Sequence, residues 1–270
     1  GSLAMWRGCR DLRFESLTLA SLSLGRQSLT LCPPAGEPIL RYGDSGLQFA
    51  AGTERLQLAG TLADTPMTIA TGPVGVAWPG ELTARDIGIE LGPRDNTQRF
   101  KVASLRADLS AETMGGDFSG ANVVLASVPL DIFDASGSWT YADERLLLTG
   151  GELRVEDRES LDRFEPLVAH DASLSLFDNL ITADAVLREP VTDRAITQVR
   201  IAHDLTTSAG HADLIVDNLT FDDDLQPAPS AARCFDRSNA VRVRPHGLSC
   251  LVLGVVSDVS GSVSGTGRID

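Results

Sequence analysis

The chain has 270 residues and carries 23 Lys and Arg against 37 Asp and Glu, which gives a formal net charge of −14 although 43% of its residues are hydrophobic. So acidic a chain argues against binding to nucleic acid, whose phosphates it would repel, and against electrostatic attraction to anionic lipid surfaces. No run approaches the roughly 18 apolar residues that a transmembrane helix needs, and the length allows one large β domain or two smaller ones.

The segment Leu12–Leu31 (LRFESLTLASLSLGRQSLTL) shows a pattern that recurs along the chain. Its apolar residues come in couplets two residues apart, which is the period of a β-strand. Odd steps separate the couplets, so a regular strand would send successive couplets to opposite faces. If all couplets face one apolar surface, a bulge or a tight bend must lie at each odd step. A helix fits some of these spacings, but the repeated Ser-Leu pairs and the Thr residues favour strands.

Alternating apolar residues then recur about every 10 to 15 residues with no helical pattern between them, which predicts an antiparallel all-β architecture. The odd step returns in later strands, from Ala84 to Ile87, from Val102 to Leu105 and from Leu125 to Val128. We therefore expect an elongated, mostly antiparallel sheet that is curled around an apolar interior.

A few short helices are expected besides the strands. Glu159–Phe164 has charges at helical spacing, and Gln226–Arg233 follows three aspartates that suit a helix N-terminus. Leu248–Val256 is apolar on all sides and fits either a buried strand or a short helix.

The four cysteines fall into two local groups, Cys9 with Cys32 and Cys234 with Cys250. Four cysteines allow three pairings; proximity favours a disulfide within each group, and four free thiols in a cytosolic protein are the alternative. Zinc binding is disfavoured, because no Cys-x-x-Cys occurs and no His lies at ligand spacing from a Cys. Disulfides would place the chain in an oxidising compartment, the periplasm or the cell exterior.

No motif predicts an enzyme, a metal site or a cofactor. The segment 43–46 (Gly-Asp-Ser-Gly) resembles the nucleophile loop of trypsin-like proteases but lacks the context for a catalytic base. His203 and His211 lie eight residues apart on predicted strands, where histidines of a polar face are more common than metal ligands. The triplet 222–224 (Asp-Asp-Asp) points its side chains apart, which favours a solvated loop over a calcium site.

The distribution of apolar residues is then the remaining indication of function. A closed two-sheet sandwich would bury one face of every strand and would make the chain a structural or adhesive module that binds protein partners. A β-solenoid would serve the same purpose. Because only 5% of the residues are aromatic, the apolar surface consists mainly of Leu, Ile, Val and Ala, which also suits a groove that holds acyl chains.

Several motifs resemble the YdbH family of periplasmic bridge-like proteins, which are related to AsmA and TamB. The most specific is LTFDDDLQP at 219–227, followed by LVLG at 251–254 and VSGTGRI at 263–269. The N-terminal segments CRDLRF at 9–14 and LTLCP at 29–33 add to the resemblance, which covers most of the chain.

The resemblance implies an intermembrane phospholipid transporter in the periplasm, with a U-shaped (taco-like) β-sheet around a hydrophobic groove. It also implies tethering to the inner membrane by a helix that precedes this sequence, and it allows an outer-membrane lipoprotein as a partner. Residues 1–2 are interpreted as a cloning scar, and 3–270 as a single elongated β domain of a longer protein, with 219–270 beginning its most family-specific region. The same domain has been linked to dicarboxylate transport, but no Arg cluster suited to a dianion is visible.

The residues expected to line the groove are apolar and alternate within their strands. They are Leu47, Phe49, Leu56, Leu58, Ile87, Ile89, Leu91, Val123, Leu125, Leu174, Leu176, Leu214 and Val216.

Overall fold

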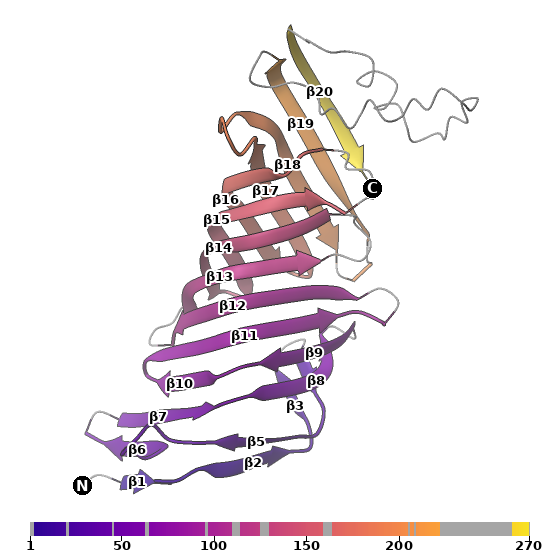
Figure 1. Ribbon diagram of the computed structural model, residues 1–270. Helices are drawn as coiled ribbons and strands as arrows, with labels where there is room; N and C mark the ends of the chain where they lie inside the picture. The colour runs from indigo at the N-terminus through magenta and orange to yellow at the C-terminus, as the bar shows by residue number, and fades with distance from the viewer. Residues whose placement is uncertain are drawn as a thin grey trace, which may run out of the picture.

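The structure is a computed structural model that describes residues 3–19, 22–44, 46–62, 65–94, 97–109, 114–124, 130–158, 164–204, 206–207, 209–221 and 261–269. These residues form an all-β fold, with no helix among them. In Figure 1, β1–β10 make up the lower part of the fold, and from β11 upward the strands follow one another in chain order to β20 at the top. Around β13–β17 strand segments pass behind the front ones, so the sheet is curved. The expected helices at Gln226–Arg233 and Glu159–Phe164 lie outside the described residues, apart from Phe164, and so does Leu248–Val256.

Short strands make up the N-terminal part and long strands the remainder. The first ten are β1 (Leu3–Met5), β2 (Arg10–Phe14), β3 (Leu17–Leu19), β4 (Leu22–Leu24), β5 (Gln27–Leu31), β6 (Leu40–Gly43), β7 (Gly46–Thr53), β8 (Leu56–Leu62), β9 (Thr65–Thr71) and β10 (Val74–Trp78). The others are β11 (Glu81–Leu91), β12 (Gln98–Asp108), β13 (Met114–Val124), β14 (Leu130–Ala142), β15 (Arg145–Asp157), β16 (Leu167–Phe177), β17 (Leu180–Arg188), β18 (Ala195–Asp204), β19 (Ala209–Phe221) and β20 (Gly261–Ile269).

From β11 to β20 each strand pairs antiparallel with the next one in the chain. On its other side β11 pairs with two strands, β10 along its first half and β9 along its second half. The result is one large antiparallel sheet that is not closed into a barrel. A second, two-stranded sheet is formed by β2 and β5.

The long strands bend where the sequence has odd steps. In β11, Ala84 and Ile87 are both buried although three residues apart, while Arg85 and Asp86 between them are exposed. In β12, Val102 and Leu105 likewise lie on one face, so both of these predicted steps are confirmed. The predicted step from Leu125 to Val128 lies outside the described residues.

Left-handed backbone conformations mark the same places in neighbouring strands. Asp86 has a φ of 51°, Gly120 59°, Asp134 53° and Gly150 67°, and the backbone N–H of Asp134 donates to Oδ1 of Asn122 in the adjacent strand. Register shifts accompany these residues in the β13–β14 and β14–β15 ladders. We call this line of residues the crease. Because bulges bend a strand and raise its twist, the crease curls the sheet.

The opening segment Leu12–Leu31 is a broken hairpin, so the helical alternative is wrong. β3 pairs with β4 inside the hairpin, and β2 pairs with β5 outside it. The odd step between Phe14 and Leu17 falls opposite the break between β4 and β5, where Arg26 forms an exposed ion pair with Glu15. The hairpin joins the main sheet through pairing of β4 with β8 and through the Cys32–Gly52 bridge.

Candidate functional site

One face of the sheet is apolar over many strands. Cross-strand partners point to the same face, and Trp139 stands in a row of such partners that crosses nine strands. This Trp139 row consists of Leu82, Ala107, Gly116, Trp139, Leu148, Leu174, Ala183, Ile201 and Ala212. None of its members is polar, which is possible because the strand period of two sends the intervening polar residues to the other face.

A second apolar row lies across the crease from the first. This Ile89 row consists of Ile89, Phe100, Val123, Ile132, Val155 and Leu167. The face positions closest to the crease are small and buried, such as Ala84, Ala121 and Ala169. Burial at the crease and exposure further out are expected when the apolar face is the inner side of the bend, since side chains converge there.

The opposite face carries the charges, together with some exposed apolar side chains such as Phe177 and Leu180. Asp184, Arg200, Asp213 and Arg268 form one ladder across β17 to β20. Nε of Arg200 lies 3.3 Å from Asp184, and Arg268 binds Asp213 with two hydrogen bonds of 2.6 and 2.9 Å. The hydrogen bond from Arg268 lowers the pKa of Asp213 below its ordinary value. Because burial of these charged side chains would cost free energy, the ladder favours contact of this face with solvent.

The apolar face is only partly covered. Within the described part of the chain no large side chain is fully buried, and the buried hydrophobic residues are few and often small. The one buried cluster joins Val155, Ala169 and Leu187 beside the crease. Further out, Ile201 is 40% exposed and Tyr141 37%. A dry two-sheet core would bury such residues, so the structure does not match a filled sandwich.

The structure places the predicted lining residues on the apolar face, except Leu125, which lies outside the described residues. Ile89 and Val123 belong to the Ile89 row, and Leu174 belongs to the Trp139 row. The others reach the same face as neighbours two residues along a strand or as cross-strand partners, namely Leu47, Phe49, Leu56, Leu58, Ile87, Leu91, Leu176, Leu214 and Val216.

The set of predicted lining residues omits several residues of this face, among them Trp139, Phe100 and Ile132. Each belongs to an alternating segment, so the period of two was a signal for it. The strand register, which shows that these residues share a face with Ile89 or Leu174, could not be read from the sequence.

Two hollows lie on the surface of the described residues. The larger, of about 740 Å³, borders Cys32 and is lined by Gly75, Ala77 and Thr83 and also by Val74 and Val76, so residues of both faces of the strands contribute to it. The smaller, of about 320 Å³, is lined by Ser175, Thr182 and Arg200 of the polar face and also by Leu174, Ala183 and Ile201 of the Trp139 row.

The remaining candidate site residues of the sequence do not come together in a metal site. His203 pairs with Ile181 and Gly210, whereas His211 pairs with Ala202, so the two imidazoles lie on opposite faces and do not share a metal. No group of three or more potential metal ligands occurs among the described residues. Ser45 and the triplet 222–224 lie outside them.

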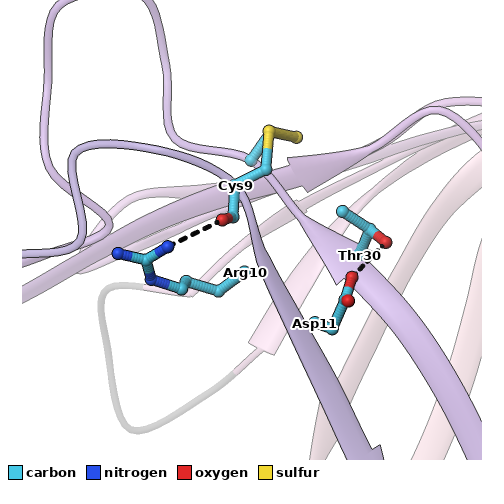
Figure 2. The surroundings of a disulfide bond; sticks show 5 residues. Cys9, Arg10, Asp11 and Thr30 are labelled. Carbon is cyan, nitrogen blue, oxygen red and sulfur yellow. Dashed lines mark hydrogen bonds between the residues drawn. A yellow bond between two sulfur atoms is a disulfide. The ribbon is translucent and has the colours of Figure 1, made fainter.

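One predicted disulfide is present. Cys9 and Cys32 are bonded, and beside them Thr30 donates a 2.7 Å hydrogen bond to Asp11 across the same ladder (Figure 2). Cys234 and Cys250 lie outside the described residues.

In the part of the chain that the structure describes, no helix has the length and apolar character needed to cross a membrane.

The comparisons with known proteins give one result. The family model described as YdbH-like, intermembrane phospholipid transport protein YdbH, matches residues 1–270, the whole chain. Neither the curated proteins nor the solved structures contain a match. Since the family model covers the full length of the sheet described above, the chain belongs to the YdbH-like family of intermembrane phospholipid transport proteins.

Proposed function

We propose that this chain shelters phospholipid acyl chains on its apolar face, as a segment of a periplasmic bridge between the two membranes. The observation that carries the proposal is the large sheet with an apolar row across nine strands, in which no large side chain is fully buried among the described residues. Large exposed apolar surfaces in soluble proteins mark sites of contact with lipid, ligand or protein. Acyl chains fit this surface because it is long, apolar and free of charged side chains along the Trp139 row.

The dimensions of the bend fit an acyl chain. From Ala135 beside the crease to Tyr141 near the strand end, six rises of about 3.3 Å each span roughly 20 Å. One leaflet of hydrocarbon is about 15 Å thick. A lipid tail can therefore lie against one side of the bend while its headgroup stays at the open rim.

The proposal includes the cellular setting that the family membership suggests. The disulfide between Cys9 and Cys32 supports an oxidising compartment such as the periplasm. Tethering to the inner membrane through a preceding helix and contact with an outer-membrane lipoprotein are further parts of the proposal. No enzymatic step is included, because the apolar rows carry no group suited to acid, base or nucleophilic chemistry.

Two neighbouring leucines provide the test. Leu148 belongs to the Trp139 row, whereas Leu147 pairs with Thr140 and Ser175 on the polar face. A photoreactive benzoylphenylalanine at position 148 should crosslink to phospholipid in protein purified without detergent, and the same group at position 147 should not. Equal labelling at both positions, or no lipid at either together with native mass spectra free of lipid, would refute the proposal.

A matched pair of charged variants extends the test. Leu148→Asp should reduce copurified phospholipid at least tenfold, because an ionised carboxylate on the apolar surface strongly disfavours contact with hydrocarbon. Leu147→Asp should retain it. If the chain is instead a structural module that binds protein partners, both variants would copurify the same small amount of lipid as the parent chain.

A further inference from the structure

The indole of Trp139 reaches across a whole strand of the apolar face. Its Nε1–H donates to the carbonyl of Arg106 at 3.3 Å. Trp139 belongs to β14 and Arg106 to β12, and β13 lies between these two strands (Figure 1). Neighbouring strands lie about 4.8 Å apart, so the side chain crosses most of the roughly 10 Å between β14 and β12. The residue of β13 in its path is Gly116, the cross-strand partner of Trp139, so the indole lies flat over Gly116.

The burial of Ala107 is a second sign of this arrangement. Ala107 of β12 is the cross-strand partner of Gly116 and is 2% exposed. Ala183 and Ala212, the two other alanines of the Trp139 row, are only half-buried although their side chains have the same size. The indole accounts for the difference, because it ends at the carbonyl of Arg106, next to Ala107 in the chain.

The strand beneath the indole is rich in glycine. Gly115, Gly116 and Gly120 all lie in β13, and a Cβ at Gly116 would collide with the carbonyl oxygen of Arg106, so position 116 cannot hold an apolar side chain. A glycine leaves its peptide groups open to the face of the sheet. Contact of hydrocarbon with open peptide groups costs free energy, because their hydrogen bonds to water are lost. We call Gly116 and the carbonyl of Arg106 the glycine gap.

We propose that Trp139 makes the apolar face continuous for lipid, because its indole covers the glycine gap. An acyl chain then meets apolar surface over β12 and β13 as it does over β15 and β16, and lipid can move across these strands without contacting bare backbone. A Trp ring suits this position, since it is broad and apolar and its one polar atom is held by Arg106. The inference deepens the proposed function and rests on it.

Photocrosslinking at two positions of matched exposure tests the proposal. Met114 of β13 is 39% exposed and lies two residues from Gly116 on the same face, whereas Ile201 of β18 is 40% exposed and lies four strands from Trp139. Benzoylphenylalanine at either position should label phospholipid in parent protein purified without detergent. In the variant Trp139→Ala, labelling at position 114 should fall about fivefold because the gap is uncovered, and labelling at position 201 should not change.

Each other outcome of this experiment has a definite meaning. Equal labelling at position 114 with and without the indole overturns the proposal and leaves the lipid shelter standing. An equal loss at positions 114 and 201 in Trp139→Ala means that Trp139 supports the whole fold, which also overturns the proposal. Absence of lipid at both positions in the parent protein refutes the lipid shelter and this proposal with it.

A refilled gap separates cover from other effects of the indole. In the Trp139→Ala background, Ala107→Leu places an apolar side chain beside Gly116 from the β12 side. This double variant should regain about half of the parent labelling at position 114, because hydrocarbon is again kept from the backbone. If labelling at position 201 is retained and position 114 is not rescued, the indole acts otherwise than by cover and the proposal is overturned.

Tryptophan fluorescence tests contact between the indole and acyl chains directly. The chain has three Trp residues, so Trp6→Phe, Trp78→Phe leaves Trp139 as the sole emitter. The probe is phosphatidylethanolamine with brominated acyl chains, loaded onto delipidated protein. Quenching of Trp139 supports the proposal. An unquenched Trp139 in protein that labels lipid at position 201 overturns it, because lipid then occupies the face without contacting the indole.

Discussion

Cys9 and Cys32 are covalently bonded at the open end of the β2–β5 hairpin, with their Cα atoms 4.0 Å apart and one step beyond the Arg10–Leu31 pair. Cys32 also exchanges two backbone hydrogen bonds of 2.8 Å with Gly52 of β7. The disulfide therefore attaches β2 to the residue through which the hairpin reaches the main sheet.

Removal of the disulfide should loosen the hairpin and leave the long strands intact. In the chain-entropy account, a disulfide that joins residues 23 apart in sequence contributes about 3 kcal/mol. Because β2 pairs with β5 alone among the described strands, Cys9→Ser, Cys32→Ser should accelerate amide exchange in residues 10–31 and not in β13–β15. Hydrogen exchange mass spectrometry measures this, with reduced parent protein as a second route to the same state. Uniform acceleration along the sheet would contradict the prediction.

The glycines of the crease should tolerate substitution unequally. A Cβ at Gly120 would lie 2.8 Å from Cβ of Ala103, and its φ is 59°, whereas Gly150 has a φ of 67° with nothing within 4 Å. Gly120→Ala should cost about 2–3 kcal/mol from strain and overlap, and Gly150→Ala about 1 kcal/mol from strain alone. Gly88→Ala is the control, because its nearest atom is 3.9 Å away. Urea unfolding checks the order; equal losses at all three positions would argue against the crease as a strained bend.

The ion pair between Asp213 and Arg268 should make the β19–β20 pairing dependent on pH. Arg268 lowers the pKa of Asp213 in the folded state, so the contribution to stability is present above the ordinary Asp pKa of about 3.9 and is lost as the pH falls through the lowered folded value. Asp213→Asn should reduce amide protection of β20 at pH 7 and remove this acid dependence. Asp217→Asn, in the same strand, should leave both unchanged. A β20 whose protection is the same in all three proteins would refute the assignment.

Two apolar residues should separate the packed part of the apolar face from its open part. Leu187 is 8% exposed in the cluster with Val155 and Ala169, whereas Ile201 of the Trp139 row is 40% exposed. Leu187→Ala should destabilise the protein by about 2–4 kcal/mol because it leaves a cavity. Ile201→Ala should cost about 1 kcal/mol. Thermal unfolding measures the difference, and a similar cost for both would mean that the outer part of the face is packed as firmly as the crease.

The sequence by itself determined the strand content and the bends. The couplets of Leu12–Leu31 and the odd steps from Ala84 to Ile87 and from Val102 to Leu105 predict strands that change phase, since a strand period of two allows no other way to keep apolar residues on one face. Local spacing of Cys9 and Cys32 likewise favoured their disulfide. These properties depend on residues close in sequence, which is why they could be read without a structure.

Only the tertiary structure decided how these strands combine into a surface. The alignment of Trp139 with Leu82 at one end of its row and Ala212 at the other depends on the register of eight successive ladders. Register comes from hydrogen bonding between segments distant in sequence, and slips at the crease shift it by one residue. Apolar alternation is the same for a filled sandwich and an open sheet. The partial exposure of the apolar face, and the reach of Trp139 across Gly116 to Arg106, therefore emerge only when the strands are placed side by side.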